Sequence, residues 1–160
     1  MQHSKSTPEN NIAETESAYA TRRHGEAFAA LLKRGDLVCL RGDLGAGKTT
    51  WTQGVARALG IECDVSSPTF VLMNEHFGRE TLLHLDAYRL EEDGEDFEIV
   101  LRDAGIFDFL TRDDAIKIVE WPSRIERFLP SSRLEVRIEN LDENRRRITT
   151  STRSSSSTQL

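Results

Sequence analysis

Cysteine is scarce in this sequence, and long apolar runs are missing from it. The 160 residues include two cysteines, Cys39 and Cys63, too few for a disulfide framework or a cysteine-rich metal site. Cys39 stands inside the apolar segment 37–40, where we expect a small buried side chain. No apolar run approaches the ~20 residues that a membrane-spanning helix needs. The sequence therefore predicts neither a disulfide-stapled protein nor one that crosses a membrane.

A secretory signal and an excess of positive charge are also missing. Residues 1–11 are polar and lack the apolar core of an export signal, so we expect a cytoplasmic protein. The chain has 21 basic and 27 acidic residues, a net charge of −6. Binding nucleic acid by broad electrostatic attraction requires a basic face. The charge balance argues against that mode but is compatible with a protein partner that holds RNA.

The length suits one domain with a single hydrophobic core. Both ends are polar, and the second contains four consecutive serines at residues 154–157. Such segments bury too little apolar surface to offset the entropy lost on ordering. We expect residues 1–11 and 152–160 to be disordered on either side of one folded domain, residues 12–151.

Helical and strand periodicities alternate along that domain, which predicts an α/β fold. The patterns predict helices at residues 14–34, 48–59, 96–104 and 106–110, and strands at 37–40, 70–77, 81–87, 116–119, 134–138 and 147–150. The link between the strands at 70–77 and 81–87 is too short for a parallel crossover, so they should pair antiparallel in a mixed sheet. In the helix at 96–104, we expect Phe97, Val100, Leu101 and Ala104 to face the core.

A glycine-rich turn separates the strand at 37–40 from the helix that begins at Lys48. Residues 42–49 read GDLGAGKT and fit G-x-x-x-x-G-K-[ST] at every defined position. Glycines let successive backbone N–H groups face phosphate oxygens, and the helix N-terminus adds its positive dipole. Lys48 would reach the β- and γ-phosphates of a nucleoside triphosphate, and the Thr49 hydroxyl would ligate Mg2+. The order strand, glycine loop, helix predicts a single P-loop NTPase domain, with a mixed β-sheet flanked by helices on both faces.

Two missing patterns narrow the choice of nucleotide. None of the lysines, Lys5, Lys33, Lys48 and Lys117, is followed two residues later by Asp, so the N-K-x-D element that selects guanine is absent. The glycines are spaced G-x-x-G-x-G, which differs from the G-x-G-x-x-G of dinucleotide-binding folds. We therefore expect ATP with Mg2+.

Two strands end on a carboxylate that suits such a site, where an acidic group holds the metal or orients the attacking water. Asp86 follows the apolar residues 82–85, and Glu120 follows residues 116–119. We favour Glu120 for the metal and Asp86 for a supporting catalytic role.

Trp121 is expected to pack beside the nucleotide. Thr69, in the segment SSPTF, stands where a switch segment would sense the γ-phosphate, although a proline turn that only starts a strand explains it as well.

Two other functions share parts of this pattern. A small-molecule kinase has the same phosphate loop but needs an arginine-bearing lid, for which Arg102 and Arg112 are the candidates. A nucleotide-dependent binding module would instead use the acidic segment 91–98 to dock a partner.

Four segments in this order resemble the bacterial TsaE-type ATPases of tRNA threonylcarbamoyladenosine biosynthesis. They are GDLGAGKTT at 42–50, SPTF at 67–70, HLDAYRL at 84–90 and VEWP at 119–122, within a likeness that covers residues 15–150. The resemblance implies Mg2+-dependent ATP hydrolysis that supports the multiprotein complex forming N6-threonylcarbamoyladenosine next to the anticodon in tRNA. It also implies that partner proteins of that complex act on the tRNA, whose contact with this chain would be indirect.

The resemblance further assigns roles to positions. It implies that Thr49 and Glu120 bind Mg2+, that Thr15 lies near the adenine, and that a basic residue of the terminal hairpin, Arg145 or Arg147, reaches the nucleotide. The expected nucleotide-binding set is Thr15, Asp43, Leu44, Gly45, Ala46, Gly47, Lys48, Thr49, Thr50, Trp121 and Arg147, and the expected catalytic set is Lys48, Thr69, Asp86 and Glu120. Ala87 stands where the family more often has a larger apolar residue, which we expect to alter packing only.

Overall fold

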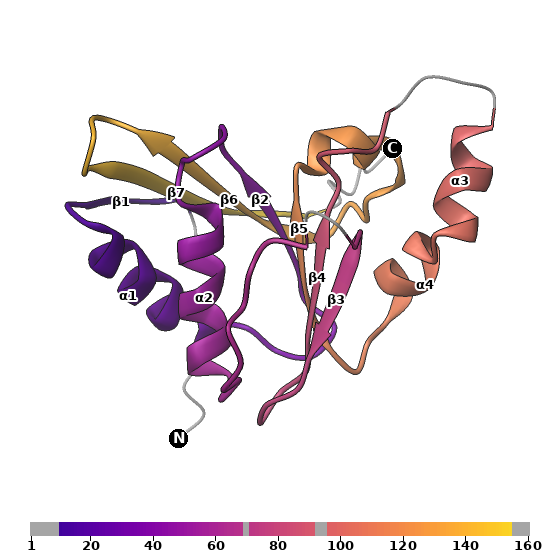
Figure 1. Cartoon of the computed structure of the whole chain (residues 1–160), viewed down its shortest axis with the longest axis horizontal. Coiled ribbons are helices and arrows are strands. Elements are labelled where there is room, and N and C mark those ends of the chain that lie inside the picture. The colour runs from indigo at the N-terminus through magenta and orange to yellow at the C-terminus, as the bar shows by residue number, and fades with distance from the viewer. Residues whose placement is uncertain (1–9, 69–70, 92–95, 155–160) are drawn as a thin grey trace, which may run out of the picture.

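A computed structural model describes residues 10–68, 71–91 and 96–154 and shows a seven-stranded mixed sheet with helices on both faces (Figure 1). The strands are β1 (Asn11–Thr15), β2 (Leu37–Arg41), β3 (Met73–His76), β4 (Leu82–Asp86), β5 (Ile116–Glu120), β6 (Arg133–Asn140) and β7 (Arg146–Arg153). The helices are α1 (Ala18–Ala29), α2 (Lys48–Ala58), α3 (Phe97–Asp103), α4 (Ile106–Thr111) and the 3₁₀ segment η1 (Pro122–Phe128). The predicted fold class is confirmed.

The strand order is β1-β7-β6-β2-β5-β4-β3. Neighbours from β6 through β2 and β5 to β4 pair parallel. β1 pairs antiparallel with β7, β7 with β6, and β3 with β4. The antiparallel β3–β4 pair agrees with the prediction from its short link. Because β2, β4 and β5 run parallel, their carboxyl ends meet at one edge of the sheet, where ligands of open α/β sheets bind.

Two apolar clusters cover the two faces of the sheet. On one face, Trp51 and Val55 of α2 pack with residues of β2, β6 and β7 such as Val136 and Ile148. On the other, α3, α4 and η1 pack against β2, β4 and β5. Figure 1 shows α1 and α2 beside the end of the sheet that carries β1 and β7, with α3 and α4 beyond β3 and β4. No helix in the described part of the chain is long and apolar enough to span a membrane.

The first predicted helix is wrong at its start. Instead of one helix over 14–34, the chain forms β1 to Thr15 and then α1 from Ala18, with the Ser17 hydroxyl accepting a 3.1 Å hydrogen bond from the Ala20 N–H. Residues 11–15 are extended because β7 offers them a ladder of backbone hydrogen bonds. β7 also continues through Arg153, so regular pairing extends slightly beyond residues 12–151 at both ends.

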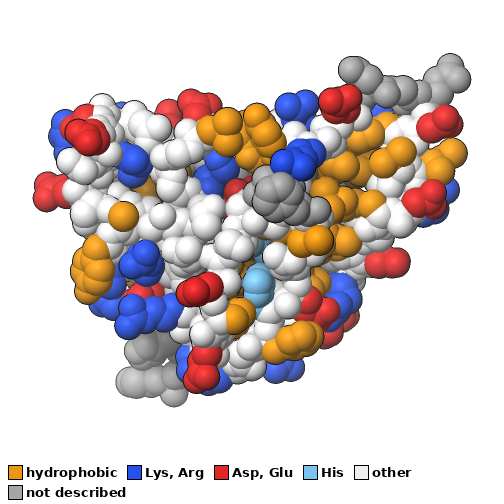
Figure 2. Space-filling model, in the orientation of Figure 1, with side chains coloured by type: hydrophobic (Ala, Val, Ile, Leu, Met, Phe, Trp, Pro, Cys, Tyr) orange, Lys and Arg blue, Asp and Glu red, His pale blue; other side chains and the backbone are white. Residues whose placement is uncertain are grey.

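Val100 is a second correction. It was expected to face the core, but its side chain is 51% exposed, as is that of its neighbour Ile99, while Phe97 and Leu101 are buried. α3 has only 7 residues and buries one narrow stripe, which leaves Val100 outside it. Figure 2 shows apolar side chains gathered on the surface over α3 and α4.

Glycines allow α1 and α2 to pack very closely. Gly25 of α1 and Gly54 of α2 are both buried. A Cβ atom on Gly25 would lie 2.2 Å from the carbonyl oxygen of Trp51, and one on Gly54 would lie 2.0 Å from that of Arg22. Both distances are far inside van der Waals contact, so a larger residue at either position requires a helix backbone to move.

We predict that Gly54→Ala lowers the free energy of unfolding by about 1–3 kcal/mol, because overpacking outweighs the ~1 kcal/mol that alanine gains in helix propensity. Urea unfolding followed by circular dichroism measures this. Arg57→Ala, on the exposed side of the same helix, is the control and should change stability by less than about 0.5 kcal/mol. A Gly54→Ala protein as stable as the parent would contradict the close helix contact.

Candidate functional site

The glycine loop lies between the end of β2 and the start of α2. Gly47 has φ 103° and is the N-cap of α2, a left-handed conformation that favours glycine. At the start of the loop, a Cβ atom on Gly42 would lie 2.6 Å from the Ile138 carbonyl oxygen, so the loop is pressed against β6. Within the described part of the chain, the backbone N–H groups of Leu44, Gly45 and Gly47 donate no hydrogen bond. These N–H groups and the N-terminus of α2 form a cradle that suits an anion.

Lys48 is folded back onto this loop. Its Nζ donates to the carbonyl oxygens of Gly42 at 2.7 Å and Asp43 at 2.9 Å. The side chain is buried, and burial lowers the pKa of the ammonium, while the nearby carboxylates of Glu120, Asp86 and Asp43 oppose that shift. Lys48 is thus a positive charge held at the loop by carbonyl groups, which a phosphate can replace as acceptor.

A hollow of about 370 Å³ opens beside the loop. It brings together residues from the phosphate loop, from the ends of β4 and β5, and from the segment after α2. Its lining is Leu44, Gly45, Gly47, Lys48, Thr49, Thr50, Ser67, Asp86, Tyr88, Glu120 and Trp121. Seven members of the expected nucleotide-binding set and three of the expected catalytic set therefore lie around one cavity.

Asp86, at the end of β4, has both carboxylate oxygens engaged. Its Oδ2 accepts a 2.7 Å hydrogen bond from the Ser67 hydroxyl, and its Oδ1 accepts a 2.9 Å bond from the Tyr88 N–H. The side chain is therefore fixed in orientation. Through this hydrogen bond, Ser67 connects the segment that follows α2 to the cavity.

Glu120 ends β5 directly beside Asp86 in the β4–β5 ladder. Its carboxylate is buried, and Oε1 lies 2.9 Å from Nε2 of the fully buried His84. Within the described residues, Oε2 makes no hydrogen bond. With one oxygen anchored and the other unengaged, Glu120 suits a divalent cation better than Asp86 does. In general, Mg2+ is held by one or two oxygen ligands of the protein when phosphates and water supply the remainder, and a threonine hydroxyl and a carboxylate both stand at this cavity.

Trp121 adopts a left-handed backbone conformation with φ 55°, unusual for a bulky residue. The conformation turns the chain from β5 into η1 and brings the indole ring to the cavity. Its ring lies 4.9 Å from that of Tyr88, and the Lys48 Nζ is 4.5 Å from its centroid. A strained, bulky residue that contacts the loop lysine supports a role at the site.

The hairpin arginine that reaches the loop is Arg146. Its Nε donates a 3.0 Å hydrogen bond to the Ala46 carbonyl. Arg147 instead pairs with Glu14 at 2.9 Å, and Arg145 pairs with Asp142 at 2.6 Å. Arg146 and Arg147 point to opposite faces because successive strand residues alternate. The nucleotide contact expected of Arg145 or Arg147 remains a prediction.

The other predicted residues lie behind or outside the cavity. Thr15 is buried opposite Arg146 in the β1–β7 ladder, with its Oγ1 2.8 Å from the Thr21 hydroxyl. Asp43 and Ala46 shape the loop through their carbonyl groups. Thr69, expected to sense the γ-phosphate, lies outside the described residues.

Sequence reasoning missed four residues of the site: Ser67, His84, Tyr88 and Arg146. His84 and Asp86 are two residues apart on β4, so strand alternation puts them on one face, and that spacing was a usable signal. Ser67 stood in the SPTF segment without a role. Which hairpin arginine faces the loop depends on the register of β6 with β7, which the sequence does not reveal.

The kinase hypothesis receives no support from its two arginines. Arg102 pairs with Glu98 on its own helix at 3.1 Å, and Arg112 pairs with Asp114 at 2.6 Å and Glu75 at 3.1 Å. Neither residue lines the cavity beside the loop. Half of the acidic segment of the binding-module hypothesis, residues 92–95, lies outside the described residues.

The sheet, the glycine loop and the cavity at the carboxyl ends of parallel strands define a nucleotide-binding protein with the P-loop NTPase fold. The family model described as "Threonylcarbamoyl adenosine biosynthesis protein TsaE" matches residues 15–148, and the chain belongs to the TsaE family. The fold is similar to the crystal structure of YdiB from Bacillus subtilis, with a TM-score of 0.74, 30% identity, and 94% of this chain and 90% of that chain covered.

The sequence is also similar to those of curated proteins named TsaE. The tRNA threonylcarbamoyladenosine biosynthesis protein TsaE of Bacillus subtilis is 39% identical over 81% of this chain and 77% of its own length. The protein of that name from Treponema pallidum is 35% identical over 83% of this chain and 94% of its own length. The similarity to these relatives thus extends over most of each protein.

We predict that Arg146→Ala weakens binding of ADP, used as the probe nucleotide, roughly five- to tenfold, because the loop loses a charge-assisted hydrogen bond. Arg147→Ala is the matched control and should stay within about twofold, since its ion pair is exposed. Isothermal titration calorimetry measures both. A larger loss of ADP affinity in Arg147→Ala than in Arg146→Ala would show that Arg147, as expected from the sequence, is the arginine that contacts the nucleotide.

Proposed function

We propose that this chain binds ATP with Mg2+ and hydrolyses it, in support of the multiprotein complex that forms N6-threonylcarbamoyladenosine next to the anticodon in tRNA. The observation that carries the proposal is the convergence of Lys48, Thr49, Asp86 and Glu120 on one cavity. Relatives named for tRNA threonylcarbamoyladenosine biosynthesis support the biological context. We place the activity in the cytoplasm, with other proteins of the complex as partners and with tRNA contacted through them.

The unpaired N–H groups of the loop would bind the phosphates, and Lys48 would exchange its two carbonyl acceptors for phosphate oxygens. Thr49 and Glu120 would hold Mg2+, which neutralises charge on the phosphates when it is bound. His84 fixes the Glu120 carboxylate, so the cavity does not have to reorganise around the ion. Asp86, held by Ser67 and the Tyr88 N–H, would orient the attacking water. Trp121 lies over Lys48 and packs against Tyr88, and with a nucleotide bound these two rings would limit the access of bulk water to the phosphates.

The first test measures phosphate release from ATP by the purified chain, alone and with the proteins of the complex. We predict that Lys48→Ala and Thr49→Ala each abolish release, because the first removes charge stabilisation of the phosphates and the second removes a metal ligand. Lys33→Ala, outside the cavity, is the control and should retain full activity. Undiminished hydrolysis in either loop variant would refute the proposal, and phosphate transfer to a metabolite instead of water would favour a kinase.

The second test separates the two carboxylates. We predict that Glu120→Ala lowers turnover on the order of a hundredfold or more, with a smaller effect on ATP affinity, because the loop still binds the phosphates. Asp86→Ala is the companion variant and should leave the Mg2+ concentration for half-maximal activity nearly unchanged. Normal turnover in Glu120→Ala would move the metal role to Asp86.

A further inference from the structure

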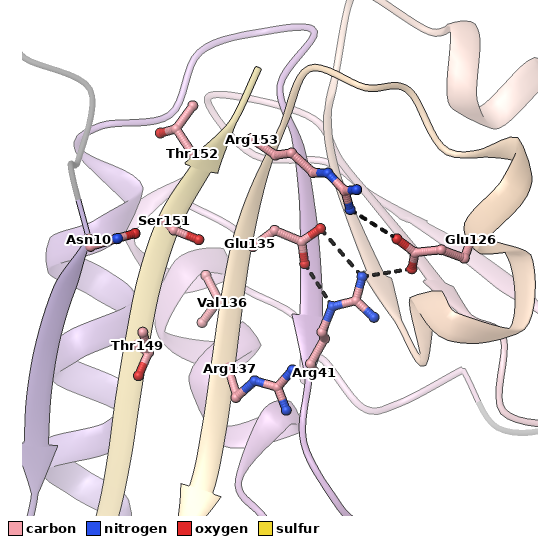
Figure 3. A pocket seen from close by; sticks show the side chains of 10 residues that line it. All are labelled: Asn10, Arg41, Glu126, Glu135, Val136, Arg137, Thr149, Ser151, Thr152 and Arg153. Atoms are coloured by element: carbon pink, nitrogen blue, oxygen red, sulfur yellow. Dashed lines mark hydrogen bonds and ion pairs between the residues drawn. The ribbon is translucent and has the colours of Figure 1, made fainter. Parts of the chain in front are cut away.

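A second hollow, of about 520 Å³, lies on the other side of the sheet from α1 and α2, over β6 and β7 (Figure 3). Side chains on this face of the two strands are polar, in contrast to the apolar cluster on the opposite face. Its lining includes the guanidinium groups of Arg41, Arg137 and Arg153 and the hydroxyl groups of Thr149 and Ser151. Guanidinium and hydroxyl groups together are donors that suit an oxyanion.

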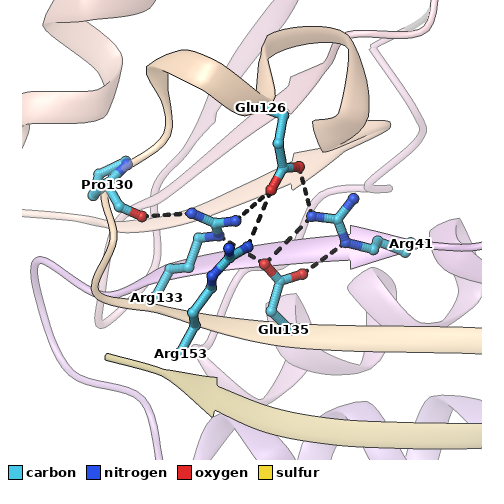
Figure 4. Close-up of polar contacts among 6 residues, drawn as sticks. All are labelled: Arg41, Glu126, Pro130, Arg133, Glu135 and Arg153. Carbon is cyan, nitrogen blue, oxygen red and sulfur yellow. Dashed lines mark hydrogen bonds and ion pairs between the residues drawn. The ribbon is translucent and has the colours of Figure 1, made fainter. Parts of the chain in front are cut away.

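Two glutamates hold most of these arginines in fixed positions (Figure 4). Glu126 contacts Arg41 at 2.7 Å, Arg133 at 2.5 Å and Arg153 at 3.3 Å. Glu135 contacts Arg41 at 2.8 Å and Arg133 at 2.7 Å. Burial opposes the charge on Arg41, but hydrogen bonds to Glu135 and Glu126 raise the pKa of its guanidinium. The network therefore presents charged arginines whose orientation is already set.

Arg137 adds a positive charge that no carboxylate balances. Its side chain is exposed and makes no hydrogen bond or ion pair within the described part of the chain. Figure 3 shows it extending from β6 toward Arg41. Arg41, Arg133, Arg137 and Arg153 carry four positive charges against the two negative charges of Glu126 and Glu135, an excess of two. Adjacent like charges of this kind are stabilised when an anion lies between them.

We infer that this hollow docks an acidic segment of a protein partner, through one or two Asp or Glu carboxylates bound by Arg137 and Arg41. The inference rests on the proposed function, which supplies the partners. A carboxylate accepts two parallel hydrogen bonds from one guanidinium, and the excess of two charges matches a short acidic segment. A long phosphate backbone fits less well, because Glu126, Glu135 and the net charge of −6 repel it.

The position of the hollow links it to the nucleotide cavity. Arg41 directly precedes Gly42, where the phosphate loop begins, and Glu126 lies on η1, which directly follows Glu120 and Trp121. The Arg41–Glu126 ion pair thus ties together the two segments that carry the cavity. A partner carboxylate that competes with Glu126 for Arg41 changes this tie, so partner binding and nucleotide affinity influence each other reciprocally.

The test adds to the full chain a short synthetic peptide that carries two adjacent glutamates in an otherwise uncharged sequence. Binding is followed by backbone amide chemical shifts and by calorimetry. We expect saturable binding, with shift changes centred on β6 and β7 near Arg137 and Ser151. Arg137→Glu should weaken binding about tenfold or more, because attraction becomes repulsion. Arg57→Glu changes the net charge by the same amount on the exposed side of α2 and should change the affinity less than about twofold.

Three results would overturn the inference: no saturable binding of the peptide, equal losses in the two variants, or tighter binding of a ten-nucleotide oligouridylate or of inorganic phosphate at the same residues. ADP affinity is measured in the same samples. If the parent chain binds ADP but not the peptide, the docking site alone is rejected. If the parent chain does not bind ADP, the proposed function is rejected.

Discussion

The parallel pairing of β2 with β5 is the constraint on which the rest of the structure depends. Leu40 lies opposite Glu120 in that ladder, so the strand that leads into the phosphate loop and the strand that ends in the buried carboxylate finish at the same edge. β4 pairs with β5 on the other side and brings Asp86 level with Glu120. These two backbone registers therefore set the separation between the anion cradle and both carboxylates, whatever rotamers the side chains adopt.

The groups that form the cavity at this edge lower the stability of the fold, and packing around the cavity offsets that loss. Unpaired N–H groups, a buried ammonium, two buried carboxylates and a left-handed Trp121 each oppose folding. Close packing of α1 on α2 through Gly25 and Gly54 supports the first two turns of α2, on the side away from the cavity's carboxylates. On the opposite face, the Arg41–Glu126 ion pair connects the loop to the segment after Trp121. Residues outside the cavity thus hold its lining in place.

Much of this arrangement could be predicted from local patterns. The apolar runs at 37–40 and 116–119 predict buried strands, and the spacing GDLGAGKT predicts the loop, because both signals are confined to neighbouring residues. The short link at residues 78–79 was enough to predict the antiparallel β3–β4 pair. The carboxylates were found for the same reason, since each directly follows an apolar strand.

The features that could not be predicted depend on distant partners. The strand β1 was not predicted, and its last two residues were assigned to a helix, because its pairing strand, β7, lies at the other end of the chain. The contact of His84 with Glu120 spans 36 residues. The choice of Arg146 over Arg147 depends on a strand register, in which a shift of one residue exchanges the two faces. Periodicity identifies which residues are buried or exposed but not which strands become neighbours.

The proposed function requires a nucleotide and its divalent ion to bind between the glycine loop and the end of β5. Paramagnetic broadening of backbone amide signals by Mn2+ with ADP, with Mg2+ and ADP as the diamagnetic reference, tests this location most directly. The amide signals of Thr49 and Glu120 should disappear first, while those of α4 should persist. Uniform weak broadening, or selective broadening at a surface away from this edge of the sheet, would contradict the proposed function.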